Sequence, residues 1–183
     1  AYVAPMNQYL QVFVTSPAGE ATRALTGVDA HNVNVRSAGG VIVFDRLDAS
    51  GVHVWRMNGD GSDARKISSG SGEQADQLSR DGRLAVIRHQ EFPNRLSVVS
   101  TQDGRVLRED TDVYGSFGLS PDGSRIALGL PVRNPLGLVR TVWRLAPATG
   151  GPATDTLRVT EQATGIQWSP DGQSVMYMDR ADP

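Results

Sequence analysis

The side chains in this 183-residue chain that are best suited to bind a ligand are polar groups that come just before a recurring tight turn. They stand where a buried strand would carry aliphatic residues. Amide, imidazole, hydroxyl and carboxylate groups that converge from several segments could hold a peptide or a small polar ligand. Alternatively, they line a wet channel and bind only water. The candidate ligand-binding residues are His31, Asn32, Asn34, Asp76, Gln77, Ser116 and Gln167.

Two other groups of residues suggest a metal site. Residues 58–63 alternate oxygen-bearing side chains and glycines, as calcium loops do. They lack both the twelfth-position glutamate and the flanking helices of an EF-hand, so a type I′ hairpin turn explains them better. His89 and Glu91 lie two residues apart, with no third ligand nearby in the sequence. We therefore predict no metal site and no cofactor.

The sequence also lacks the motifs of several function classes. It has no Gly-x-Ser-x-Gly elbow, no phosphate-binding loop and no cysteine, so we predict no catalytic residue. The net charge of −2 argues against a nucleic-acid or acidic-membrane partner. No apolar run reaches the 18 residues of a membrane span. Because Ala1 is not an initiator methionine, we expect a processed or trimmed chain.

The turn that follows the polar residues occurs four times. Its fullest copies are Gly118–Leu130 and Trp168–Tyr177, which read as a strand end, a Ser-Pro-Asp-Gly turn and a second strand. Proline presets φ at the first corner of such a turn, and glycine tolerates the positive φ at its end. The turn glycines are spaced by 43, 41 and 49 residues, at Gly39, Gly82, Gly123 and Gly172. A period near 40–45 residues is typical of a four-stranded propeller blade.

Each repeat is predicted to carry four short strands and no helix. In the first full repeat these are Val33–Arg36, Val41–Phe44, Val52–Met57 and Ala64–Ser68. We predict an all-β fold, a β-propeller of four-stranded antiparallel blades with about four blades in a partial or closed ring. Residues 1–183 form one domain or propeller section. Its repeats are approximately 1–30 (partial), 31–72, 73–112, 113–162 and 163–183 (partial).

Three apolar residues stand directly before the turn, at Leu78, Leu119 and Trp168. At this position a side chain is expected to insert between neighbouring blades. We therefore predict that all three are almost fully buried. Trp55 and Trp143 occupy equivalent third-strand positions, and we expect both to pack in the core.

These motifs resemble the TolB-type propeller repeat, a WD-like family. Its signature is a Ser-Pro-Asp-Gly turn after an aromatic or apolar residue. Trp168–Gly172 matches in full and Leu119–Gly123 nearly so, whereas Leu78–Gly82 has Arg80 in the proline position. A second landmark, an apolar third strand, a turn and a short fourth strand, occurs at Val54–Ser68. The resemblance implies a bacterial protein in a periplasmic or extracytoplasmic location; the compartment cannot be read from the sequence otherwise.

The same repeat occurs in periplasmic TolB-like proteins, in sensor domains and in the propellers of prolyl-oligopeptidase-like enzymes, so it implies no single activity. The first hypothesis is a non-enzymatic binding or scaffolding module that recognises a protein, peptide or small ligand at the channel mouth. The alternative is a regulatory or substrate-gating propeller of a serine peptidase whose catalytic domain lies outside this chain.

The two ends of the chain both align with the second strand of a blade, at Tyr2–Ala4 and Val175–Tyr177. They could meet and close a four-bladed ring, or the chain could be a section of a ring of six to eight blades. Closure would leave one second strand redundant, which favours the open section. Unpaired strand edges at both ends would then promote self-association.

Overall fold

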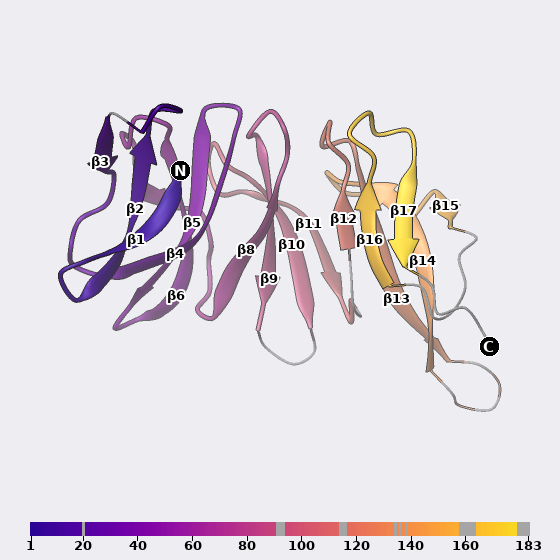
Figure 1. Cartoon of the computed structure of the whole chain (residues 1–183). Coiled ribbons are helices and arrows are strands. Elements are labelled where there is room, and N and C mark those ends of the chain that lie inside the picture. Colours follow the sequence, from indigo (N-terminus) through magenta and orange to yellow (C-terminus); the bar gives the residue numbers. More distant parts are fainter. Residues whose placement is uncertain are drawn as a thin grey trace.

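The computed structural model describes residues 1–19, 21–90, 94–113, 117–133, 135, 137, 139–157 and 164–178. In these ranges every regular element is a β-strand, and the strands form five antiparallel sheets that follow one another in chain order (Figure 1). The same ranges contain no helix with the length and apolar character needed to cross a membrane. The predicted all-β class is confirmed.

Sheets 2 to 4 each have four strands, and the two end sheets have fewer. Sheet 1 comprises β1 (Tyr2–Met6), β2 (Tyr9–Thr15) and β3 (Thr22–Ala24). Sheet 2 comprises β4 (His31–Ala38), β5 (Val41–Asp48), β6 (Gly51–Asn58) and β7 (Arg65–Lys66). Sheet 3 comprises β8 (Glu73–Leu78), β9 (Leu84–His89), β10 (Arg95–Ser100) and β11 (Val106–Thr111). Sheet 4 comprises β12 (Phe117–Leu119), β13 (Arg125–Arg133), β14 (Val139–Pro147) and β15 (Asp155–Thr156). Sheet 5 comprises β16 (Thr164–Trp168) and β17 (Val175–Met178).

The recurring turn joins the first two strands of a sheet, as predicted. Its glycine has positive φ in all four copies, between 55° and 75°. In the three Asp-Gly copies the carboxylate accepts a hydrogen bond from the hydroxyl of the serine two residues earlier. For example, Ser120 Oγ donates to Asp122 Oδ1 at 2.6 Å. Gly39, in the most divergent copy, lies so close to the next sheet that a Cβ there would be 2.0 Å from the Asp81 carbonyl oxygen.

The core consists of apolar layers between successive sheets. Alternate residues of β5 face opposite neighbours, since Ile42 and Phe44 pack toward sheet 1 and Val43 packs toward sheet 3. Two further layers join sheets 3 and 4 and sheets 4 and 5. This two-sided burial explains why the second strands read as continuous apolar runs.

The row of sheets is open. Sheet 1 lies at one end and sheet 5 at the other (Figure 1), and within the described residues β17 pairs with β16 alone. The structure therefore contradicts the closed four-bladed ring considered above. The described residues form an open propeller section of about four blades. In the described residues sheet 1 has three strands and sheet 5 has two.

The burial predicted for the residues before the turn is wrong in two of three cases. Leu119 is buried, but Leu78 and Trp168 are only partly buried. Trp168 still bridges two sheets, because its Nε1 donates to the Gly118 carbonyl at 2.8 Å. Its ring stays partly open because sheet 5 has no third strand in the described residues. Trp143 is buried as expected, whereas Trp55 is partly buried beneath the Arg46 guanidinium.

Candidate functional site

The candidate polar residues lie on the first strands of the sheets, and these strands are irregular. The pairing register shifts between Val33 and Arg36 in β4, between Ala75 and Gln77 in β8, and between Thr164 and Gln167 in β16. Such bulges redirect side chains from the face of a sheet. Here they direct amide side chains toward the neighbouring sheet.

Asn34 and Gln77 connect adjacent sheets. Asn34 has φ of 53°, and its Nδ2 donates to the Ala75 carbonyl at 2.6 Å. Gln77 Nε2 donates to the Phe117 carbonyl at 3.0 Å, and the Leu119 backbone N–H donates to Gln77 Oε1 at 2.6 Å. Both amides therefore satisfy backbone groups of the next sheet.

Asp45 supports the Asn34 connection from within the core. It is buried, and it accepts from Asn34 Nδ2 at 2.8 Å and from the Ala75 backbone N–H at 2.8 Å. Burial raises the pKa of this carboxyl, while the two hydrogen bonds oppose the rise.

Asn32 and His31 lie at the sheet 1 boundary. Asn32 is fully buried and donates to Gln11 Oε1 at 3.0 Å and to the Ala30 carbonyl at 3.2 Å. His31 Nδ1 accepts from the Leu10 backbone N–H at 3.2 Å. These two residues hold sheet 1 against sheet 2, away from the other candidates.

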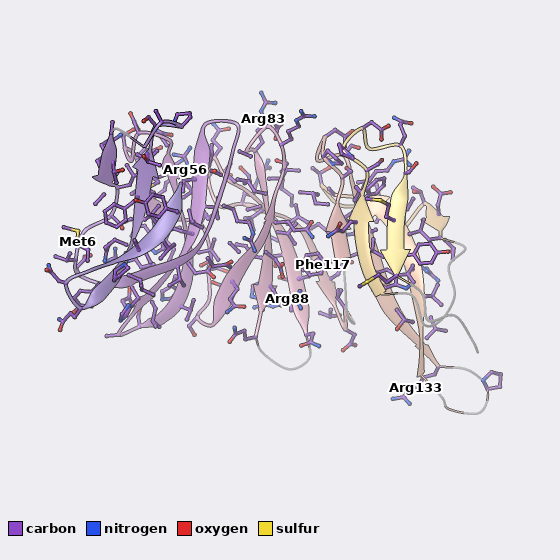
Figure 2. The ribbon with its side chains drawn as sticks, viewed as in Figure 1. Met6, Arg56, Arg83, Arg88, Phe117 and Arg133 are labelled. Carbon is purple, nitrogen blue, oxygen red and sulfur yellow. The ribbon has the colours of Figure 1, made fainter. Side chains whose placement is uncertain are left out.

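Asp76 belongs to a more open group. Its carboxylate accepts from Arg88 Nε at 2.8 Å, and Arg36 Nε donates to its carbonyl at 2.6 Å. The Arg88 guanidinium lies 4.9 Å from the centre of the Phe117 ring, and Figure 2 shows these two side chains near each other in the middle of the row. The Asp76 side chain is 29% exposed to solvent and the Arg88 side chain is 46% exposed. We call Arg36, Asp76, Arg88 and Phe117 the Asp76 group.

The structure thus brings Asn34, Asp76 and Gln77 together at sheets 2 to 4, and leaves the other candidates apart. Gln167 is exposed on sheet 5. Ser116 lies outside the described residues.

Two cavities are lined by residues that the sequence did not single out as ligand-binding. One, of about 410 Å³, lies where three successive turns meet and is lined by Arg80, Asp81, Pro121, Asp122, Pro170 and Asp171. Hydrogen bonds from Ser120 and Ser124 lower the pKa of Asp122 to about 2. The repeated turn was the signal that could have located this cavity. The other cavity, of about 480 Å³, lies between sheets 4 and 5, and its apolar lining includes Leu145, Leu157, Trp168, Val175 and Tyr177.

The side chains of Ser97, His89 and Glu73 are arranged in the order of a nucleophilic triad, which the sequence did not predict. Ser97 Oγ is 2.8 Å from His89 Nε2, and His89 Nδ1 is 3.3 Å from Glu73 Oε1. Exposure of these side chains is 4% or less. Arg95 Nη2 also lies 3.0 Å from His89 Nδ1. Since a substrate carbonyl cannot reach the buried Ser97 hydroxyl, this row of side chains joins β8, β9 and β10 rather than forming an accessible site.

The predicted hairpin at residues 58–63 is present. The Asn58 backbone N–H donates to the Ser62 carbonyl at 2.9 Å, and the Asp60 and Asp63 carboxylates accept from Ser62, Arg56 and Arg65. In the part of the chain that the structure describes, no three His, Asp or Glu side chains form a metal-binding group.

Comparisons with known proteins place the fold. No protein-family description and no curated protein matches the sequence. Among solved structures, the tricorn protease is 17% identical with a TM-score of 0.69, over 91% of this chain and 17% of its own. A prolyl endopeptidase is 13% identical with a TM-score of 0.65, over 81% of this chain and 26% of its own. TolB from Acinetobacter baumannii is 16% identical with a TM-score of 0.57, over 98% of this chain and 45% of its own.

The chain spans less than half the length of each of these three proteins. At such low identity the similarity concerns the fold alone. Together with the successive antiparallel sheets and the Ser-Pro-Asp-Gly turns, it shows that the chain has a TolB-like β-propeller fold.

Proposed function

We propose that this chain is a non-enzymatic binding or scaffolding module that recognises a protein, a peptide or a small ligand at the channel mouth. The observation that carries the proposal is the Asp76 group. It combines a carboxylate and two guanidinium groups with the buried ring of Phe117, contributed by three neighbouring sheets. Arginine is among the side chains that dominate the energetics of many protein interfaces.

The candidate residues have different roles under this proposal. Asp76 and Gln167 are exposed enough to contact a ligand directly. Asn32, Asn34 and Gln77 position the sheets that carry them, because their amides bond to neighbouring sheets. Following the TolB-type resemblance, we propose a protein or peptide partner and a periplasmic or extracytoplasmic location.

Peptides displayed on phage provide a probe for this site. Peptides selected on the 183-residue chain should lose at least about tenfold in affinity in Asp76→Asn and in Arg88→Gln. The matched controls are Asp155→Asn and Arg83→Gln, both exposed and outside the Asp76 group. Circular dichroism checks that each variant folds. Selected peptides that bind both site variants with unchanged affinity would place the binding surface elsewhere.

The alternative, a gating propeller of a serine peptidase, is favoured by one observation. The tricorn protease and the prolyl endopeptidase superpose on this chain with higher TM-scores, 0.69 and 0.65, than the 0.57 of TolB. The discriminating experiment is peptidase activity of the full-length gene product, with a fluorophosphonate probe for a reactive serine. Labelling of a hydrolase segment after residue 183 would support the gating propeller and contradict the purely non-enzymatic module.

A further inference from the structure

Three charged or titratable side chains stand directly opposite one another at one end of sheet 3. Glu73 of β8 pairs in register with His89 of β9, and His89 pairs in register with Arg95 of β10. Side chains at directly opposite positions of antiparallel strands lie within contact distance. Glu73 and His89 are buried, whereas the Arg95 side chain is 29% exposed. We call these three residues the His89 triplet. It connects a buried pair to a side chain at the surface.

One nitrogen of the His89 ring has two neighbours that it cannot satisfy together. Nδ1 lies 3.0 Å from Arg95 Nη2 and 3.3 Å from Glu73 Oε1. A guanidinium only donates hydrogen bonds, and an ionised carboxylate only accepts them. Nδ1 therefore accepts from Arg95 when it carries no proton, and donates to Glu73 when it carries one. The two arrangements exclude each other.

The other ring nitrogen keeps the same partner in both arrangements. His89 Nε2 is 2.8 Å from Ser97 Oγ, and this hydroxyl donates to Glu109 Oε2 at 3.4 Å. Because the serine hydrogen is directed to the carboxylate, Nε2 donates to Oγ whether the ring is neutral or charged. The neutral ring then has its one hydrogen on Nε2, which leaves Nδ1 to accept from Arg95. Adding a proton changes only the partner of Nδ1.

The surroundings of the ring suit both arrangements. Glu73 Oε1 accepts from the Gly70 backbone N–H at 3.0 Å, and within the described residues Oε2 has no hydrogen-bond partner. Burying such a carboxylate is costly, so a protonated imidazole beside it is a favourable counter-charge. Two further titratable groups lie nearby. Arg95 Nη1 pairs with Glu109 of β11 at 3.2 Å, and His53 of β6 contacts the Gly70 carbonyl at 2.7 Å. Arg95 can therefore leave the ring and keep its ion pair with Glu109.

Arg95 also reaches the Asp76 group. A narrow cleft of about 20 Å³ lies between sheets 3 and 4, and Arg95 forms part of its wall. A volume of this size holds about one water-sized group, so a displaced side chain changes its shape completely. Two members of the Asp76 group, Arg88 and Phe117, line the same cleft. The remaining lining residues are Asn94, Leu96 and Val113.

We propose that protonation of His89 moves Arg95 and thereby regulates the binding surface at the Asp76 group. Above the range in which histidine titrates, about pH 5 to 8, Arg95 donates to the neutral ring and holds the wall of the cleft in place. As the pH falls through this range, Nδ1 takes up a proton and donates to Glu73. The imidazolium then repels the Arg95 guanidinium, which stays paired with Glu109 alone. The effect on binding rests on the proposed function, whereas the exchange of partners at His89 does not.

Nitrogen NMR of the imidazole rings tests the exchange in the chain without any ligand. The chain has three histidines, and loss of one signal in His89→Gln assigns the ring. At pH 8 the His89 signals should show an unprotonated Nδ1 and a protonated Nε2, and at pH 5.5 both nitrogens should be protonated in the folded chain. Glu73→Gln should keep Nδ1 unprotonated at pH 5.5, because the counter-charge is lost. The matched control is Asp103→Asn, which removes an exposed carboxylate beyond the other end of β10 and should leave the titration unchanged. A protonated Nδ1 at pH 8, or an unprotonated one throughout, would overturn the proposal.

Peptide affinity at two pH values tests the effect on binding. Histidine-free peptides selected on the chain at pH 7.5, with an affinity that falls in Arg88→Gln, should bind at least about fivefold more weakly at pH 5.5. In His89→Gln, which takes up no proton, their affinity should be the same at both values, and circular dichroism checks its fold. Equal affinity at both values in the unmodified chain would overturn the regulation. Selected peptides that do not depend on Arg88 would instead contradict the proposed function, and the NMR spectra would still decide the exchange at His89.

Discussion

Single amide side chains hold neighbouring sheets together, and their types were visible in the sequence while their partners were not. The pattern identified Asn34 and Gln77 as polar residues on first strands. Their acceptors are the carbonyls of Ala75 and Phe117, about forty residues further along the chain. Which carbonyl an amide reaches depends on a bulge and on the spacing of two sheets. Neither has a local sequence signal, so these side chains looked like free ligand groups.

Replacement of Gln77 tests the cost of losing such a connection. Gln77→Leu leaves the Phe117 carbonyl and the Leu119 N–H without their amide partner inside the protein. An unsatisfied buried polar group costs about 1–3 kcal/mol, so the free energy of unfolding should fall by at least that amount. Urea denaturation measures it, with the exposed Gln102→Leu as control. Equal stability of the two variants would show that the amide contributes nothing to holding the sheets.

Two adjacent glycines separate backbone strain from steric contact. Gly39 and Gly40 both have positive φ, 55° and 77°. A Cβ on Gly39 would be 2.0 Å from the Asp81 carbonyl oxygen, whereas one on Gly40 would have no atom within 4 Å. Gly40→Ala should cost about 1–2 kcal/mol from strain alone. Gly39→Ala should cost clearly more, because two sheets must move apart. Thermal denaturation measures the stability of both variants. Equal losses of stability would contradict the close contact between Gly39 and the Asp81 carbonyl.

The turn carboxylates predict a dependence of stability on acid. Hydrogen bonds from Ser120 and Ser124 lower the pKa of Asp122 from 3.8 to about 2. A lowered pKa in the folded state stabilises the fold above the unfolded value, and this stabilisation is lost as pH falls from about 4 to 2. Asp122→Asn should therefore reduce the change in unfolding free energy across that window. The control is the exposed Asp112→Asn, and an identical pH slope in both variants would contradict the assignment.

At the scale of strands, hydrophobic patterning located the elements but missed where they end. Proline is unusual inside a strand, so Pro131 would be expected to end the strand after Leu130. Instead β13 continues to Arg133 and pairs with β14, Pro131 lying opposite Thr141. Proline is tolerated there because β12 pairs only as far as Leu128, so the other edge of β13 has no strand beside it in the described residues. Local composition cannot reveal which part of a strand has a neighbour on both sides.

Arginines on the fourth strands couple neighbouring sheets, because Arg23, Arg65 and Arg108 each donate to a backbone carbonyl in the turn after the third strand of the next sheet. Arg108 bonds to the Pro147 and Gly151 carbonyls and pairs with Asp110 at 2.5 Å, and both side chains are largely buried. Arg108→Ala should lower the free energy of unfolding by about 1–3 kcal/mol, because buried polar partners lose their donor. The exposed Arg105→Ala should change it by less than about 0.5 kcal/mol. Chemical denaturation compares the two variants, and a loss as small as that of Arg105→Ala would show that Arg108 does not couple sheets 3 and 4.

At the scale of the whole molecule, the repeat period indicated the number of sheets but not the shape of the row. The spacing of Gly39, Gly82, Gly123 and Gly172 predicted successive four-stranded units, which the structure contains. Whether the ends meet depends on the rotation from each sheet to the next. Side-chain volumes in all the layers set this rotation, and no motif encodes it. The incomplete burial of Trp168 follows from the same open end.

An open row should also show graded stability from its middle to its ends. A sheet in a stack is stabilised by its own strands and by each neighbour it contacts. Sheets 2 to 4 have two neighbours, whereas sheets 1 and 5 have one each. Amide hydrogen exchange should therefore be slowest in β5, β6, β9 and β10 and fastest in β1 and β17. Uniform protection along the row, or faster exchange in β5 and β9 than in β1 and β17, would contradict the graded stability.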